Sequence, residues 1–388
     1  MVELHTVRIG DLGRVVTGKT PPSSQPELFG ELHPFLTPTD IDGFARYIEP
    51  ARFLSPEGRD HQHRLMLPER AVCVVCIGAT IGKVCMTGRP SFTNQQINSV
   101  VVNENEHDPF FVYHLLTTLR DELKSNAGGA ATPIINKTAF SEIEVSVPPL
   151  PVQRRIAGIL SAYDELMENS QRRIRILEAM AHALYREWFV HFRFPGHEKL
   201  PPFASPLGDI PQGWEVKMVK DILARRAAGT VYREADVKPE GETPVIDQST
   251  NELLGFHDNE PDHLASPVKP IAIFGDHTCK MQLLVEPFSV GPNVVPFAAV
   301  DSLPAAYVFH LVSSRVQTQE YKRHWIPLNA KEVIVADPVT AESFASLIQP
   351  TLVAQETLRK VIRNLRRTRD LLLPRLLSGQ VNLAGKNG

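Results

Sequence analysis

Two stretches of the chain carry apolar residues at alternating steps of four and three, the spacing of a helix that packs along one face in a coiled coil. The first stretch runs from about Pro149 to Phe189 and the second from about Pro338 to Leu377. The first seam consists of Ile156, Leu160, Tyr163, Met167, Ser170, Ile174, Leu177, Ala181, Leu184 and Trp188. The second consists of Phe344, Ile348, Thr351, Gln355, Leu358, Ile362, Leu365, Arg369, Leu372 and Leu376. The pattern predicts two long helices that pair with each other.

Neither seam is fully apolar, because Ser170 interrupts the first and Gln355 and Arg369 interrupt the second. Polar layers of this kind either fix the register of the paired helices or face a further helix. Pro350 lies inside the second stretch, so that helix is expected to be kinked or to begin there, and Pro374 is expected to disturb its last turns.

A globular block precedes each helix, and the second block repeats landmarks of the first about 190 residues later. The matched segments are Val7–Leu12 with Met218–Leu223, Gly78–Lys83 with Gly275–Lys280, Val112–Leu115 with Val308–Leu311, and Pro133–Asn136 with Ile326–Asn329. Between these landmarks the blocks differ freely, as expected of two modules that share a scaffold and recognise different targets.

Each block mixes strand and helix signals, such as the strand-like runs Ala71–Ile77 and Ile97–Val102 and the helical run Pro109–Leu119. We therefore predict two copies of a mixed α/β (α+β) globular module, joined by two long α-helices that pair as a coiled coil. The predicted boundaries are 1–148 for the first module, 149–196 for the first helix, 197–337 for a linker with the second module, and 338–388 for the second helix and tail.

The first helix is expected to end in a cluster of aromatic residues, Trp188-Phe189-Val190-His191-Phe192-Arg193-Phe194. We interpret these rings as packing the helix end against the following module rather than stacking on bases.

The chain has 388 residues, of which 43% are hydrophobic and 22% charged, as is usual for a protein with two or more cored domains. A net charge of −3 argues against a protein that simply coats nucleic acid, although it leaves room for local basic surfaces. No apolar run reaches the roughly 18 residues needed to cross a bilayer, and the amino terminus does not resemble a secretion signal. A cytoplasmic location is expected.

Cys73 and Cys76 have the C-x-x-C spacing of some zinc sites. They lie in a run that reads as a buried strand, where two positions three apart point to opposite faces. We interpret them as small core residues.

Gly13-Arg14-Val15-Val16-Thr17-Gly18-Lys19-Thr20 matches the phosphate-binding P-loop pattern, and Asp337 ends an apolar run that resembles a magnesium-binding strand. A P-loop must lead directly into a helix, but Pro21 and Pro22 follow Thr20 and disfavour that conformation. Nucleotide hydrolysis is therefore not expected. The sequence also contains no Asn-Pro-Pro-aromatic motif and no catalytic constellation, so we predict a chain that is not an enzyme by itself.

The order module, helix, module, helix resembles the DNA specificity subunit of Type I restriction-modification enzymes. Four landmarks carry the resemblance over essentially the whole length. They are Thr17-Gly18-Lys19-Thr20-Pro21, Pro149-Leu150-Pro151-Val152-Gln153-Arg154-Arg155-Ile156, Ile210-Pro211-Gln212-Gly213-Trp214 and Leu372-Leu373-Pro374-Arg375-Leu376-Leu377-Ser378-Gly379.

The resemblance implies that each module is a target-recognition domain reading one half of a bipartite, gapped DNA site, and that the helices set the unread gap. It further implies that two methyltransferase subunits dock on the chain for DNA methylation and that motor nuclease subunits join them. S-adenosylmethionine, ATP and Mg would then belong to those partner subunits, and this chain would bind no cofactor itself.

Reading base edges requires side chains that donate and accept hydrogen bonds in pairs, and binding phosphates requires cations or amides. The candidate DNA-binding residues of the first module are Lys19, Thr20, Lys83, Asn94, Gln95, Gln96, Asn136 and Lys137. Gln95 or Gln96 suits adenine and the lysines suit phosphates, although each residue has an alternative role as a turn-capping or solvated side chain. The counterparts expected in the second module are His277, Lys280, Asn329 and Lys331.

The second helix is rich in cations, and its stretch Arg359, Lys360, Arg363, Arg366 and Arg367 is the predicted partner-binding surface. Phosphates, an acidic partner and simple solvation remain open for it. An alternative for the whole chain is a coiled-coil scaffold that assembles proteins and reads no DNA.

Overall fold

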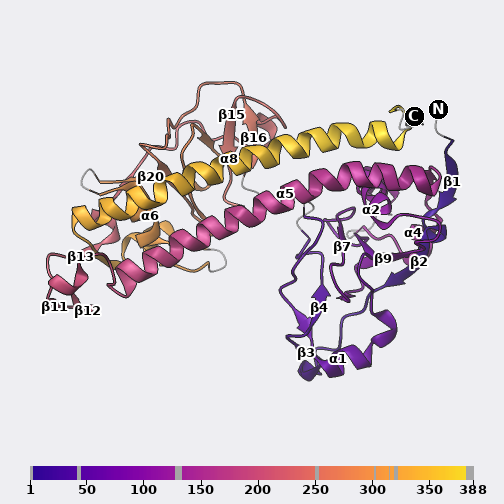
Figure 1. The fold of residues 1–388 in the computed structure, drawn as a ribbon, viewed down its shortest axis with the longest axis horizontal. Helices are drawn as coiled ribbons and strands as arrows, with labels where there is room; N and C mark the ends of the chain where they lie inside the picture. Colours follow the sequence, from indigo (N-terminus) through magenta and orange to yellow (C-terminus); the bar gives the residue numbers. More distant parts are fainter. Residues whose placement is uncertain are drawn as a thin grey trace, which may run out of the picture. The chain divides into compact units, whose positions relative to one another are not determined.

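The computed structural model describes residues 3–41, 45–126, 133–249, 253–300, 303–313, 315–318 and 322–381, and it divides into two compact units (Figure 1). Unit 1 comprises Met1–Asn169 and Val361–Gly388, and unit 2 comprises Ser170–Lys360. Each unit contains one globular module and a segment of each long helix. Within the described ranges, no helix is long and apolar enough to span a membrane.

A four-stranded antiparallel sheet with the order β2-β9-β6-β7 forms the centre of the first module. Its strands are β2 (Gly13–Thr17), β9 (Ile97–Val102), β6 (Val72–Val75) and β7 (Val84–Met86). β6 is buried along its length, and its side chains alternate between two separate apolar cores. Cys76 belongs to one core and Cys73, with Cys85, to the other, which confirms that the two cysteines are core residues on opposite faces.

Smaller sheets and short helices complete the first module. β1 (His5–Arg8) pairs with β10 (Glu144–Val147), and β3 (Phe29–Gly30), β5 (Phe53–Leu54), β4 (His33–Leu36) and β8 (Phe92–Thr93) form a second sheet in that order. β4 and β8 are parallel. The helices are α1 (Pro56–His61), α2 (Pro109–Thr118), α3 (Arg120–Asn126) and α4 (Lys137–Glu142).

The second module repeats this topology. Its central sheet has the order β14-β20-β17-β18, formed by β14 (Leu223–Arg225), β20 (Val294–Ala299), β17 (Ile271–Gly275) and β18 (Met281–Leu284). β13 (Glu215–Met218) pairs with β21 (Glu332–Val335) as β1 does with β10. β15 (Thr243–Ile246) lies between β16 (Leu253–His257) and its parallel partner β19 (Ser289–Val290). The helices are α6 (Ala305–Val312) and α7 (Trp325–Asn329). The matching strand orders confirm the internal repeat.

A hairpin of β11 (Pro202–Ser205) and β12 (Gly208–Pro211) precedes the second module. It lies near the start of the range 197–337, where the sequence predicted a linker before the second module.

The two long helices are α5 (Leu150–Tyr185) and α8 (Pro338–Leu377), and each contributes residues to both units. In unit 1, Ile156 and Leu160 share a core with Leu373 and Leu376. In unit 2, Glu178 contacts Arg359 while Tyr185 contacts Phe344, so the helices run antiparallel there. The predicted pairing is confirmed, and no seam residue is exposed.

α8 begins at Pro338 and is continuous through Pro350 and Pro374. Asp337 caps its first turn, because its Oδ1 accepts hydrogen bonds from the backbone N–H groups of Val339 and Thr340 at 3.0 Å. Of the two outcomes expected at Pro350, a helix beginning at this proline is therefore wrong.

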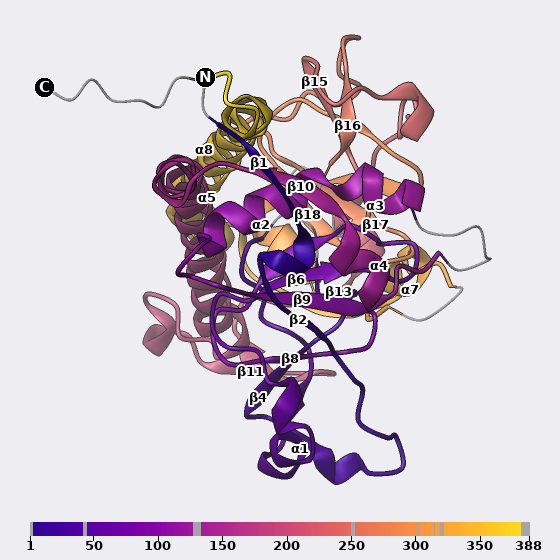
Figure 2. The same ribbon diagram turned by 90° about the vertical axis from the view of Figure 1, so that its right-hand side faces the viewer.

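The polar seam position Arg369 pairs with α5, and its partner there also lies beside a further helix, α2. Its guanidinium donates to Asp164 of α5 at 2.7 Å, and Asp164 Oδ2 lies 3.2 Å from His114 Nε2 of α2. Figure 2, which looks along the long helices, shows α2 beside α5. A second ionic contact in unit 1 joins Arg46 to Glu168 of α5 through two hydrogen bonds of 3.1 Å. The first module is thus fixed to its helix segment by buried charges as well as by apolar packing.

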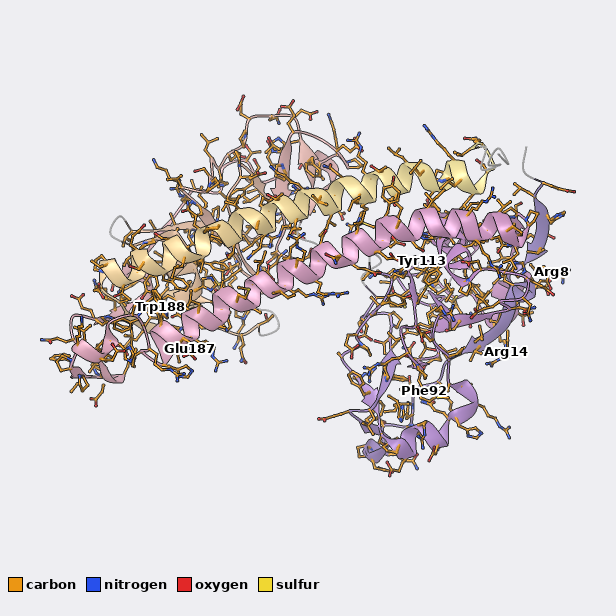
Figure 3. All side chains as sticks on the ribbon, viewed as in Figure 1. Arg8, Arg14, Phe92, Tyr113, Glu187 and Trp188 are labelled. Carbon is orange, nitrogen blue, oxygen red and sulfur yellow. The ribbon has the colours of Figure 1, made fainter. Side chains whose placement is uncertain are left out.

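In unit 2 the end of α5 passes into a single π-helical turn, Arg186–Val190, which carries Trp188 and Phe189 (Figure 3). Phe189 lies 4.7 Å from Tyr307 and 5.6 Å from Trp214, measured between ring centroids. Trp188 and Phe189 are more than nine-tenths buried, which confirms that these rings pack the helix end against the second module.

Candidate nucleic-acid interface

The turns that carry the candidate residues of the first module meet at one end of its central sheet. Strand register requires this arrangement, because Val75 pairs with Ile97, Val74 with Val84, and Thr17 with Asn98. The residues after β2, between β6 and β7, and before β9 therefore leave the sheet on the same side. We call this region the polar end of the first module. Its turns carry Lys19, Thr20, Lys83, Asn94, Gln95 and Gln96.

Residues 133–137 join the polar end through backbone hydrogen bonds. The N–H of Gly78 donates to the carbonyl of Pro133 at 3.0 Å, and the N–H of Ile135 donates to the carbonyl of Cys76 at 2.9 Å. The structure thus brings together all eight residues predicted for this module, namely Lys19, Thr20, Lys83, Asn94, Gln95, Gln96, Asn136 and Lys137.

Side-chain hydrogen bonds order the amides of this end. Thr20 Oγ1 donates to Gln95 Oε1 at 2.7 Å, and Asn94 Nδ2 donates to Gln96 Oε1 at 2.9 Å. Asn94 is buried, Gln96 half-buried and Gln95 exposed. Gln95 is consequently the amide of this turn best placed to meet a base edge, whereas Asn94 supports the turn from within.

Two glycines shape these turns in different ways. A Cβ on Gly18 would overlap the backbone carbonyl of Thr93, where the N–H of Lys19 donates at 3.0 Å. Gly78 has a φ of 94°, a left-handed conformation that a side chain strains. Phe92 begins the buried strand β8, which ends directly before the turn that carries Asn94, Gln95 and Gln96 (Figure 3).

The cations of the polar end fall into two kinds. Lys19 and Lys137 are exposed, as phosphate contacts require. Lys83 is half-buried, and its Nζ donates to the backbone carbonyl of Ile41 at 2.6 Å. Asn136 caps α4 by accepting from the N–H of Ala139 at 2.9 Å, which is the turn-capping alternative of this residue.

The corresponding end of the second module contains His277 and Lys280. The N–H of His277 donates to Gln248 Oε1 at 3.1 Å. Asp276 Oδ1 accepts from the N–H groups of His324 at 3.0 Å and Trp325 at 2.9 Å, so this carboxylate caps α7.

The predicted equivalence of Asn329 with Asn136 is wrong. α4 begins seven residues before β10, as α7 does before β21, so the counterpart of Asn136 is the α7 cap His324. Asn329 lies at the end of α7, and the carbonyl of Lys331 bonds to the N–H of Val219, next to the opposite end of the central sheet. The predicted equivalence was based on similar short sequences, whereas strand register determines which residues occupy the same place in the two modules.

The cationic stretch of α8 makes ion pairs inside the molecule. Arg359 lies 3.0 Å from Glu178 and 3.9 Å from Glu356, and only 14% of its side chain is exposed. Lys360 pairs with Glu286. Arg363, Arg366 and Arg367 also make contacts within the protein. The predicted partner-binding surface is therefore already engaged in part by the fold.

Two residues were missed by sequence reasoning, Asp276 and Arg46. Asp276 directly follows a strand-ending glycine, a signal that was available in the sequence. Arg46 has no local signal, since its partner Glu168 is far along the chain. The P-loop pattern is excluded in the structure, where Gly13–Thr17 is strand β2 and Asp337 caps α8 and accepts from Trp214 Nε1 at 3.2 Å.

Residues 1–179 match the family model described as the Type I restriction modification DNA specificity domain. The Type I restriction enzyme MjaIX specificity subunit of Methanocaldococcus jannaschii is 25% identical over 97% of this chain and 93% of that protein. The HindI specificity subunit of Haemophilus influenzae is 33% identical, over 44% of this chain and 38% of that protein. In fold, the chain is similar to the crystal structure of a Type I restriction-modification S subunit from M. genitalium, with a TM-score of 0.57, 14% identity, and coverage of 97% of this chain and 96% of that one.

Proposed function

We propose that this chain is a specificity subunit of the Type I restriction enzyme family, and that it reads a bipartite DNA sequence, one block of base pairs for each module. The observation that carries this proposal is the repetition of one strand order in two modules, with a polar end built from the corresponding turns in each. Their turns differ in sequence, which supports two different half-sites.

Within each polar end we assign the two parts of recognition to different residues. Exposed lysines such as Lys19 and Lys137 hold phosphates, which fix the position of the duplex without reading it. The carboxamide of Gln95, oriented by Thr20, reads a base edge in the major groove. In the second module, His277 lies on the corresponding turn.

The chain acts in this proposal as the non-catalytic subunit of a larger enzyme. Methyltransferase subunits and motor nuclease subunits dock on it, and they bring S-adenosylmethionine, ATP and Mg. The paired segments of α5 and α8 serve as the spacer between the two blocks of base pairs.

The proposal is tested by selecting bound duplexes from a randomised double-stranded DNA library with the purified full chain. We expect two conserved blocks separated by an unread gap of fixed length, and an affinity that falls steeply with salt. Enrichment without any sequence preference would favour the scaffold alternative. Turnover of ATP or S-adenosylmethionine by the chain alone would contradict its assignment as non-catalytic. Methylome sequencing of the source cell, with and without the gene, provides the same two-block motif independently.

A further inference from the structure

The two modules contain the same lysine contact at the same place in the fold. In the first module, Lys83 Nζ donates to the carbonyl of Ile41 at 2.6 Å. In the second, Lys280 Nζ donates to the carbonyls of Ser249 at 2.7 Å and Asp247 at 3.2 Å. In both cases the acceptor lies shortly after the strand with a parallel partner, in residues 37–41 after β4 or residues 247–249 after β15. We call these two segments the held loops.

The two lysines are also equivalent in strand register. Lys83 directly precedes β7, and its carbonyl accepts from the N–H of Val75 at 2.9 Å. Lys280 directly precedes β18, and its carbonyl accepts from the N–H of Gly275 at 2.8 Å. The intervening turns are 76–82 and 276–279, so the contact persists despite a different turn length and sequence.

Each held loop touches the turn that carries candidate base readers. In the first module, the N–H of Asn94, which is next to Gln95, donates at 3.1 Å to the carbonyl of Leu36, the last residue of β4 before the held loop. In the second module, Gln248 lies inside the held loop, and it accepts from the N–H of His277 and from Thr278 Oγ1. These hydrogen bonds connect each held loop to a turn that carries candidate base readers.

Since the proposed function is DNA reading, we propose that Lys83 and Lys280 are positioning residues, each of which holds a recognition loop in shape for its own half-site. This replaces the phosphate role that the sequence suggested for them. An ammonium group that donates to backbone carbonyls is directed into the protein, whereas Lys19 and Lys137 are exposed.

The test compares Lys83→Met and Lys280→Met with Lys19→Met, a matched loss of one exposed lysine of the first module. Each full-length variant is used in the same selection from randomised duplex DNA. We expect Lys83→Met to lower discrimination about tenfold or more in one block only, and Lys280→Met to do so in the other block. The salt slope of binding should stay unchanged for both, whereas Lys19→Met should lower it by about 0.9. Lys83→Arg, which keeps a cationic donor, should restore part of the discrimination.

Equal weakening of both blocks together with a reduced salt slope would overturn the inference, because that is the signature of a phosphate contact. Hydrogen exchange tests it without DNA. We expect faster amide exchange in residues 36–41 of Lys83→Met and unchanged exchange there in Lys19→Met. Unchanged exchange in Lys83→Met would reject the positioning role, whatever the DNA selection shows. If the wild-type chain selects no motif, the proposed function itself is rejected. If Lys83→Met melts before the assay temperature, Lys83→Gln replaces it with the same expectations.

Discussion

Asp164 of α5 and Arg369 of α8 form an ion pair of 2.7 Å inside unit 1, where 4% and 13% of their side chains are exposed. Burial alone would raise the pKa of the Asp164 carboxyl, but His114 and Arg369 hold it below the usual value. The pair explains how a helix seam tolerates an arginine. It also places a buried charge beside residues of three helices, α2, α5 and α8.

Removing Arg369 takes away the guanidinium that pairs with the buried Asp164 carboxylate. We expect Arg369→Met to lower the free energy of unfolding by about 3 kcal/mol. Urea denaturation followed by circular dichroism measures the change. Arg375→Met, at an exposed position of the same helix, is the control and should change stability by less than about 0.5 kcal/mol. Equal stability of the two variants would show that the pair is dispensable.

His310 makes the stability of unit 2 depend on pH. Burial against Tyr185 and Phe344, with a smaller contribution from His182, lowers the pKa of its imidazole to about 4. The folded pKa is thus below the unfolded value of about 6.5, so the neutral ring's contribution is present above pH 6.5 and is lost as the pH falls toward 4.

We therefore expect unfolding of unit 2 to become easier by up to about 3 kcal/mol between pH 6.5 and pH 4. The measurement is urea unfolding monitored by tryptophan fluorescence, since Trp188, Trp214 and Trp325 all lie in unit 2. His310→Phe should flatten this dependence, whereas the exposed-site variant His191→Asn should retain it. A retained dependence in His310→Phe would assign the effect to another group.

Lys19 lies exposed at the polar end of the first module. If it holds a phosphate, Lys19→Ala should weaken binding to cognate and non-cognate duplexes by a similar factor and lower the salt slope by about 0.9. Fluorescence anisotropy at several salt concentrations provides both quantities. Glu57→Ala, on the surface of α1, is a control for which we expect no loss of slope.

Gln95 should act on sequence preference instead. We expect Gln95→Ala to reduce discrimination at a single base pair of one half-site by about 1 to 3 kcal/mol while leaving the salt slope unchanged. Competition titrations with duplexes changed at one position measure this. Thr20→Val, which removes the donor to Gln95 Oε1, should produce a smaller loss at the same base pair. Losses spread evenly over all positions would argue that Gln95 does not touch a base.

The paired helices and the repeated modules were predictable because both produce repeating patterns in the sequence, the regular spacing of apolar residues and the recurrence of similar segments. Seam spacing located α5 and α8 to within a few residues, and the echo of Val7–Leu12 in Met218–Leu223 marked equivalent strands. The core position of Cys73 followed from strand alternation alone. These features depend on local patterns, which a single sequence displays.

What the sequence left open depends on contacts between distant residues. Arg369 pairs with Asp164, which also lies beside His114 of α2, and no spacing rule connects these residues to it. Asn329 was matched to Asn136 because the short sequences around them are similar. The helix that begins seven residues before the next strand is capped by Asn136 in the first module and preceded by His324 in the second. Strand register brought six of the eight candidates of the first module together, and backbone hydrogen bonds of residues 133–137 added Asn136 and Lys137. Their individual roles depended on burial, which separates Lys83 from Lys19.

The core of unit 1 includes Leu373 and Leu376 of α8 together with Ile156 and Leu160 of α5. Ribosomes synthesise these two leucines about two hundred residues after Leu160, which at about 5 to 20 residues per second is a delay of about 10 to 40 s. For that time the nascent chain lacks the two leucines of α8 that complete this apolar core. Chaperones and proteases therefore have a defined interval in which to act on every newly made copy.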